Sequence, residues 1–173
     1  MFHIDAENLC WLEGCEASDL CLHGDAVAVI GERTIRYEDC TVSSTALYLL
    51  KSLTEDHILN QENQMLPCCG FSVIPADDGE NVHICGCPNG EDWTIRHIDG
   101  AVELILDDGY TVTVPLSEYR RDVLAFVQKI ENFYHASAPR QLPEEKWERD
   151  AWLLLCREWR RRFMAALDIS GVL

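Results

Sequence analysis

Residues 92–114 read DWTIRHIDGAVELILDDGYTVTV, and this stretch decides the fold class. It contains three strand-like runs, 92–98, 101–106 and 110–114, which are joined by Asp99-Gly100 and Asp108-Gly109. Asp-Gly between apolar runs favours tight turns whose backbone twist matches that of paired antiparallel strands. The stretch therefore predicts a three-stranded antiparallel meander.

The central run also predicts which side chains share a face of the meander. Val102, Leu104 and Leu106 should lie on one face and Glu103 on the other, because successive side chains of a strand point in opposite directions. The segment 117–134 follows with an apolar stripe at helical spacing. We expect this helix, capped by Ser117, to pack on one face of the meander.

Two hairpins are expected outside the meander. Each pairs two short apolar runs across a segment rich in turn-forming residues. The paired runs are 27–30 with 34–37, and 71–74 with 82–85.

The other segments read as helix, loop or irregular chain. Apolar residues recur at helical spacing over 42–53, whereas 58–67 is rich in amides and predicts a mobile loop. Residues 1–18 show no clean period and are expected to be irregular or partly helical. The predicted fold is a single α+β domain over 1–173, with a mainly antiparallel sheet (two hairpins plus the meander) and helices packed on one face. The C-terminal helix, about 143–167, is expected as an appended element.

The C-terminal helix carries an aromatic face and a cluster of positive charge. Trp152, Leu155, Trp159 and Phe163 are spaced to share one face, and arginines crowd the others. The arginines are Arg157, Arg160, Arg161 and Arg162. We expect them to neutralise the acidic remainder of the chain, with contact to an acidic partner as the alternative. Four arginines do not make a nucleic-acid-binding surface in so acidic a protein.

The net charge limits the kinds of partner that the protein is expected to bind. With 14 Lys and Arg against 30 Asp and Glu, the formal net charge is -16, which opposes binding to nucleic acid or to an anionic membrane. The charge is expected to serve solubility first, and it would also attract a basic protein partner. No run reaches the roughly 18 apolar residues that span a bilayer. The first 16 residues hold four acids and no Lys or Arg, which is not the pattern of a secretory signal, so we expect a cytoplasmic protein.

The nine cysteines are the chemically distinctive residues. Cys68 and Cys69 precede one strand of the second hairpin, and Cys85 and Cys87 end its partner, so the four thiols are expected close together. Zinc takes four such ligands, but usually with a gap of two to four residues within each pair, whereas vicinal cysteines in a strand face opposite sides. We therefore expect packed, reduced thiols and no stoichiometric zinc, with a zinc site as the alternative.

Motifs of known catalytic chemistry are lacking. The sequence has no G-x-S-x-G, P-loop, dinucleotide fingerprint or H-E-x-x-H, and Asp92 and His97 sit on opposite faces of one expected strand. Two hypotheses remain open. The favoured one is a non-catalytic protein-binding role, and the alternative is a metal- or thiol-dependent enzyme built on Cys68, Cys69, Cys85 and Cys87.

Four segments, 39–43, 46–51, 64–70 and 86–93, carry a resemblance to known proteins. They read DCTVS, ALYLLK, QMLPCCG and GCPNGEDW, and together they resemble a family of small uncharacterised bacterial proteins. That resemblance implies no activity, cofactor or catalytic residue. More loosely, a small acidic α+β chain is similar to the immunity proteins that neutralise toxins between competing bacteria, which implies binding to a protein partner.

The protein-binding hypothesis places the partner on an acidic rim. Glu91, Asp92, Asp107 and Asp108 fall in connections at one end of the meander, because alternate turns of a meander emerge at opposite ends. Replacing all four by their amides is expected to slow association with a basic partner and to change fold stability little.

Overall fold

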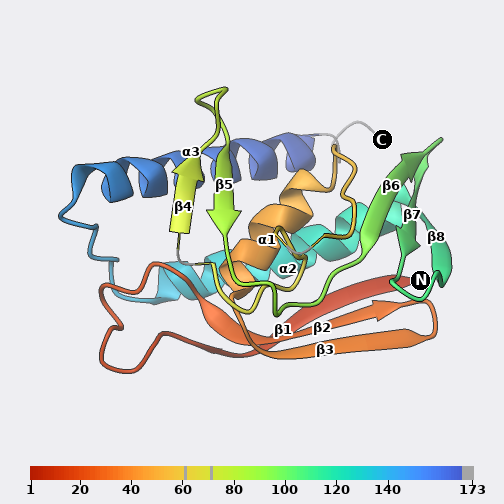
Figure 1. The fold of residues 1–173 in the computed structure, drawn as a ribbon, viewed down its shortest axis with the longest axis horizontal. Helices are drawn as coiled ribbons and strands as arrows, with labels where there is room; N and C mark the ends of the chain where they lie inside the picture. The colour runs from red at the N-terminus through yellow and green to blue at the C-terminus, as the bar shows by residue number, and fades with distance from the viewer. Residues whose placement is uncertain (61, 71, 169–173) are drawn as a thin grey trace.

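The computed structural model describes residues 1–60, 62–70 and 72–168, and its strands form three separate antiparallel sheets (Figure 1). The strand orders are β1-β2-β3, β4-β5 and β6-β7-β8. Strands and helices are segregated along the chain, which confirms the predicted α+β class. In chain order the elements are β1 (Phe2–Cys10), β2 (His23–Ile30), β3 (Arg33–Cys40), α1 (Val42–Lys51), β4 (Ser72–Pro75), β5 (Val82–Cys85), β6 (Thr94–Ile98), β7 (Ala101–Ile105), β8 (Thr111–Pro115), α2 (Leu116–Ala136) and α3 (Lys146–Asp168).

The chain opens with a strand, so the expectation of an irregular lead-in was wrong for residues 2–10, whereas residues 11–18 are irregular as expected. Phe2, Ile4 and Ala6 are buried and alternate with more polar residues, which is the period of a half-buried strand. β1 pairs with β2 in a register that sets Ile4 opposite Ala28. The buried residues of both strands therefore lie on one face of the first sheet.

Two helices cover that buried face. α1 packs against α2 and β2, and α2 packs against β1. The rings of Phe2 and Tyr119 lie 4.8 Å apart, and the hydroxyl groups of Tyr119 and Ser52 are 2.7 Å apart within the core. Buried side chains from all three sheets and all three helices belong to one hydrophobic cluster.

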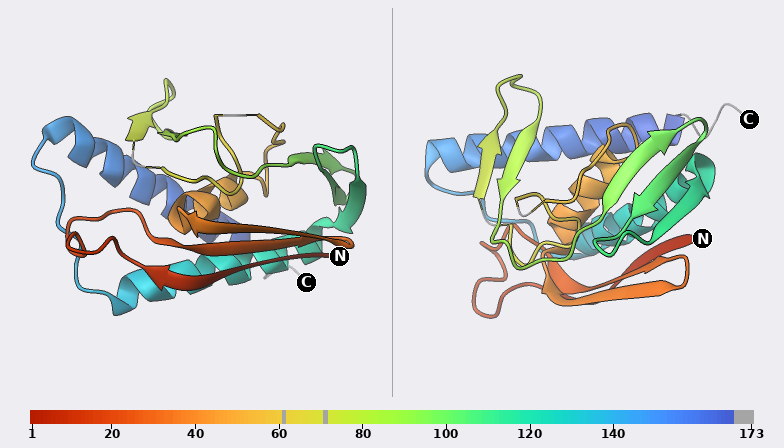
Figure 2. Two further views of the ribbon diagram at one scale, coloured as in Figure 1. Left: turned by 60° about the horizontal axis from the view of Figure 1, so that its bottom comes forward. Right: turned by 45° about the vertical axis from the view of Figure 1, so that its right-hand side comes forward.

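The meander has the predicted strands and faces. Val102 and Leu104 are fully buried, while Glu103 lies on the other face and pairs with Arg96. Both views of Figure 2 place this sheet at the end of the first one, where the backbone N–H of Glu32 donates to the hydroxyl of Tyr110 at 3.2 Å. The prediction that Ser117 caps this helix was wrong, because α2 begins at Leu116 and its N-cap is Pro115, which also ends β8.

α3 packs through a face other than the predicted one. Its buried residues are Ala151, Leu154, Glu158, Phe163 and Ala166, whereas Trp152, Leu155 and Trp159 are only half-buried. The difference comes from Glu158, a fully buried carboxylate that accepts a 2.7 Å hydrogen bond from the backbone N–H of Val82. Lys51 and Arg162 neutralise it at 3.3 and 2.8 Å. This buried ionic contact docks α3 on α1 and on the second hairpin.

The amide-rich segment 58–67 is tied down at its ends. His57 pairs with Ile95 and Leu66 with Glu91 through isolated antiparallel bridges, and Met65 and Leu66 are fully buried. Gln61 of this segment and Phe71, the expected start of the second hairpin, lie outside the described residues. Among the described helices, none combines the length and apolar character that crossing a bilayer demands.

Candidate functional site

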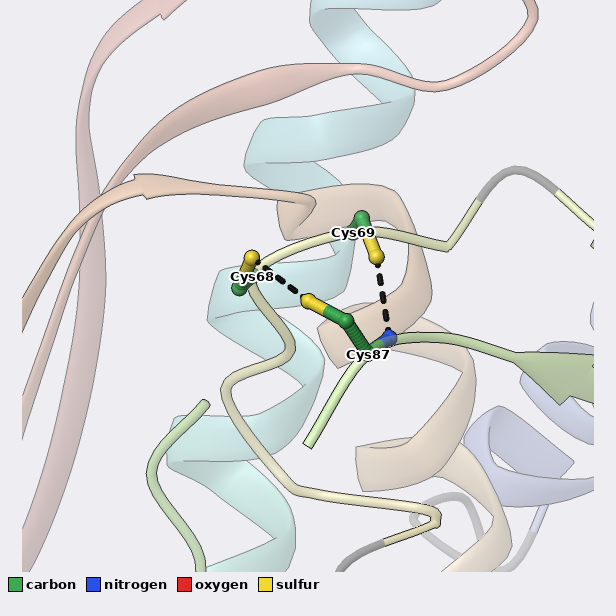
Figure 3. Close-up of side chains that lie close together, drawn as sticks. All are labelled: Cys68, Cys69 and Cys87. Atoms are coloured by element: carbon green, nitrogen blue, oxygen red, sulfur yellow. Dashed lines mark hydrogen bonds between the residues drawn. The ribbon is translucent and has the colours of Figure 1, made fainter. Parts of the chain in front are cut away.

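Three thiols converge where the loop before β4 runs beside the loop after β5 (Figure 3). The Sγ atoms of Cys68, Cys69 and Cys87 all lie within 4.8 Å of one another, and each residue is half-buried. The Sγ atoms of Cys68 and Cys87 are 2.9 Å apart. The backbone N–H of Cys87 also donates to the Sγ of Cys69 at 3.0 Å. We call this group the thiol cluster.

The two loops are held side by side by a short ladder of hydrogen bonds. Leu66 and Glu91 exchange both backbone bonds, at 2.9 and 3.0 Å. The side-chain amide of Gln64 extends the ladder, since it donates to the carbonyl of Gly90 at 2.9 Å and accepts from its N–H at 2.7 Å. The Gln64 side chain thus pairs with Gly90 in the way that a strand backbone would. It fixes the separation of the two loops that carry the thiols.

Two glycines allow the loops to approach so closely. A Cβ atom on Gly86 would lie 2.4 Å from the carbonyl oxygen of Cys69, and one on Gly90 would lie 2.3 Å from that of Leu66. Backbone cannot yield to such contacts without moving the loop. The glycine in Cys85-Gly86-Cys87 therefore brings Cys87 within reach of the two vicinal thiols.

The cluster is anchored to the first sheet and to α1. The carbonyl of Pro67 accepts a 3.0 Å bond from the N–H of Thr41, just before α1, and the hydroxyl of Tyr37 on β3 donates to the carbonyl of Asn89. Burial, and then a hydrogen bond with Cys68, raise the pKa of Tyr37 to about 12, so this phenol stays protonated. Both loops are thus fastened to the core.

The three thiols of the cluster differ in pKa. Hydrogen bonds from the thiols of Cys68 and Cys69 lower the pKa of Cys87. The bond to Cys87, together with burial, raises the pKa of Cys68, and burial raises the pKa of Cys69 to about 11. Cys87 is therefore the thiol that ionises first, with two neutral thiols facing it.

The fourth cysteine proposed from the sequence lies outside the cluster. Cys85 is exposed in β5, on the same side as exposed His83, whereas Val82 and Ile84 face the core. Strand alternation thus directs Cys85 outward. Cys68 and Cys69 lie in a loop and not in a strand, so the argument that vicinal thiols must face opposite sides does not apply to them.

The acidic rim is only partly exposed. Glu91, Asp107 and Asp108 are exposed, but the side chain of Asp92 is only 4% exposed. Its Oδ1 accepts from the backbone N–H of Met65 at 2.9 Å and lies 2.8 Å from the Nε2 of His57. Its Oδ2 accepts from the N–H of Asn60 at 2.9 Å. The Asp92 carboxylate therefore organises the loop beneath the cluster.

Sequence reasoning missed the histidine partner of Asp92. It weighed His97, whose Nδ1 instead lies 2.9 Å from the Oδ1 of Asp56. His57 is 35 residues from Asp92 in sequence, and only the antiparallel bridge between His57 and Ile95 brings the two together. No local sequence signal could have found that pair, and the same holds for Gln64 and Gly90.

The donor set of the cluster suits a soft metal ion. Zinc binds thiolates at about 2.3 Å, which in a tetrahedral site places sulfur atoms about 3.8 Å apart. The three Sγ atoms span up to 4.8 Å, and the 2.9 Å gap between Cys68 and Cys87 would have to widen by about 0.9 Å. Such a change is within the reach of side-chain rotation.

Comparison of the chain with models of protein families, with curated proteins and with solved structures finds no match. The resemblance to small bacterial proteins therefore stays a prediction.

Proposed function

We propose that this chain is a metal-binding protein that holds one zinc ion through Cys68, Cys69 and Cys87. The observation that carries the proposal is the convergence of three sulfur atoms within 4.8 Å of one another from two separate loops. Soft thiolate ligands select zinc and similar ions over the hard ions that prefer oxygen. The sequence favoured free thiols, but the geometry favours the alternative.

The clamp around the cluster supports this proposal. The Gln64 to Gly90 bonds, the Leu66 to Glu91 bonds and the close packing at Gly86 all fix loop positions independently of the thiols. A site whose loops are already in place loses less conformational freedom when the ion binds. Three thiols also leave one coordination position for a water molecule or an external ligand, as in zinc sites that do chemistry.

A nucleophilic thiol role is less well supported by the same geometry. A reactive thiolate usually has a cationic neighbour or a helix N-terminus beside it, whereas the pKa of Cys87 is lowered by hydrogen bonds from the two thiols and from backbone N–H groups. A divalent cation would instead offset two of the three negative charges of a trithiolate site. The proposed role is therefore metal binding and not thiol catalysis.

Cobalt substitution tests the proposal directly. The reduced protein, freed of metal by a chelator, would be titrated with Co²⁺, whose thiolate charge-transfer absorption reports sulfur ligation and whose visible bands report tetrahedral geometry. We expect saturation at one equivalent and displacement of Co²⁺ by Zn²⁺. Cys87→Ser should abolish the charge-transfer band, whereas Cys85→Ser, on the outer face of the hairpin, should leave it unchanged. A band that survives Cys87→Ser, or no band in the unaltered protein, would overturn the assignment.

A second candidate function is electrostatic binding of a basic protein at Glu91, Asp107 and Asp108. Pairing of Thr94 with Ile105 sets the turn after β7 beside the segment that leads into β6, so the three exposed carboxylates share one end of the meander. Asp108 has one weak exposed ion pair, with Arg33 at 3.5 Å. Affinity capture at low and high salt tests it. A basic partner recovered in this way should associate more slowly when Glu91, Asp107 and Asp108 are replaced by their amides. A partner whose association rate changes neither with salt nor with these substitutions contradicts the proposal.

A further inference from the structure

A cavity of about 480 Å³ opens between α2, α3, the start of α1 and β4. Its main wall is the aromatic face of α3, formed by Trp152, Leu155, Trp159 and Phe163. These are the residues that the sequence assigned to one apolar face, and the fold buries only Phe163 among them. The half-buried apolar surface of the other three is therefore directed into a concave space and not into the core.

The walls of the cavity are fixed by hydrogen bonds. The indole Nε1 of Trp159 donates to a carboxylate oxygen of Glu131 on α2 at 2.9 Å. The hydroxyl of Tyr134, on the same helix, donates to the carbonyl of Leu20 at 2.8 Å. Both aromatic side chains are held in place by hydrogen bonds to other residues of the protein, so the space is preformed and does not depend on a ligand to open it.

One positive charge at this cavity is left without an anion. Arg160 lines the cavity and is exposed, and within the described part of the chain it makes no ion pair. Other arginines, such as Arg120 and Arg157, also make no ion pair among the described residues, so Arg160 is distinguished by its position in the cavity lining. The one carboxylate in the lining, that of Glu131, already accepts from Trp159. His135, which like Glu131 belongs to α2, is a further polar residue of the lining.

The thiols in the lining add no negative charge. Burial raises the pKa of Cys21 to about 12 and that of Cys156 to about 11, so both are neutral thiols at physiological pH. The Sγ of Cys21 donates to the carbonyl of Gly70 at 3.3 Å. The surface offered to a ligand is thus largely aromatic and aliphatic, with the Arg160 guanidinium, the hydrogen-bonded Glu131 carboxylate and His135 as polar groups of the lining.

We propose that this cavity binds a small amphipathic anion, namely a carboxylate with an apolar body. The apolar body lies against Trp152, Trp159 and Phe163, and the carboxylate pairs with Arg160, whose planar guanidinium matches carboxylate geometry. The volume falls within the range of about 300–1,000 Å³ that is typical of small-molecule pockets, which suits a body of about ten carbon atoms.

Two tryptophans in the wall provide the assay, because their fluorescence responds to an apolar ligand beside them. The full-length protein would be titrated with decanoate, and in parallel with decanol, which has the same chain and no charge. Decanoate should bind more tightly than decanol, and Arg160→Gln should weaken decanoate binding about tenfold or more while leaving decanol unchanged. Arg157→Gln is the matched control, since Arg157 is exposed on the same helix but does not line the cavity, and it should change neither ligand.

Two further variants test whether the ligand binds inside the cavity and whether this site is separate from the thiol cluster. Leu155→Trp should fill the cavity and abolish binding of both ligands, with thermal melting to confirm that the variant folds. Cys87→Ser should leave decanoate binding intact, which separates this site from the proposed metal site. No fluorescence change at sub-micellar decanoate would overturn the proposal. Equal affinity for the two ligands, or an Arg160→Gln variant that binds decanoate normally, would do the same.

Discussion

The carboxylate of Asp92 is expected to carry much of the stability of the loop that supports the thiol cluster. Asp92→Asn keeps the shape of the side chain but replaces the acceptor Oδ2 by an NH2 group that faces the N–H of Asn60. That half-buried donor then has no acceptor, at a cost of about 1–3 kcal/mol. The contacts of Oδ1 with His57 and Met65 also change from charge-assisted to neutral, at about 1 kcal/mol each.

The expected loss is therefore about 4 kcal/mol in the free energy of unfolding, well above the effect of an ordinary surface change. Urea denaturation followed by circular dichroism measures it. With a slope of about 2 kcal/mol/M, the midpoint should fall by about 2 M. Asp107→Asn is the control, because Asp107 is exposed, and it should stay within about 0.5 kcal/mol of the unaltered protein. If Asp92→Asn lowers the free energy of unfolding by less than about 1 kcal/mol, the structural role assigned to Asp92 is refuted. Asp92 would then again be a candidate for binding a partner.

Three further outcomes are expected. Glu158→Gln should lower the free energy of unfolding by about 3 kcal/mol in urea denaturation, because it leaves the largely buried ammonium group of Lys51 without its counter-ion and leaves Arg162 with the exposed carboxylate of Glu55 alone; an unchanged midpoint would show that the network contributes nothing. Gly86→Ala should weaken Co²⁺ binding at least tenfold in the spectroscopic titration, since its Cβ would lie 2.4 Å from the carbonyl of Cys69 and push the loops apart; unaltered affinity would mean that the loops can adjust. Burial raises the pKa of Cys40 from 9.0 to about 12, so the unfolded chain loses this proton first and the free energy of unfolding should fall between about pH 9 and pH 12. Cys40→Ala should flatten part of that decline in melting curves recorded across the range, and identical slopes would contradict the assignment.

The features that follow from short-range chemistry were predictable from the sequence. Asp99-Gly100 and Asp108-Gly109 specify their turns locally, so the meander and the burial of Leu104 could be predicted. β1 was equally local, and its alternation of Phe2, Ile4 and Ala6 was overlooked because acidic and polar residues lie between them. That error came from interpreting the pattern and not from missing information.

The candidate site depends on contacts between distant residues, and these could be predicted only in part. The hairpin formed by β4 and β5 brings its ends together, which correctly placed Cys87 near Cys68 and Cys69. The outward direction of Cys85 depends on the strand ending where it does, and the loop conformation of the vicinal pair depends on Gln64 and Gly90. The α3 face was mispredicted because a buried ion pair at Glu158, and not an apolar stripe, determines how that helix docks.

The thiol cluster closes a ring in the chain. Cys68 and Cys87 are 19 residues apart, and the whole β4–β5 hairpin lies between them. A bond or shared ion at that point removes about 3 kcal/mol of chain entropy from the unfolded state, by the loop-closure relation for cross-links. α3 holds the hairpin near its tip, because Arg161 and Arg162 both donate hydrogen bonds to the side chain of Asn81. The proposed zinc ion would therefore fix the base of an element that α3 already holds near its tip, so that its loss would loosen the base of the hairpin while the contacts with α3 and both three-stranded sheets stay in place.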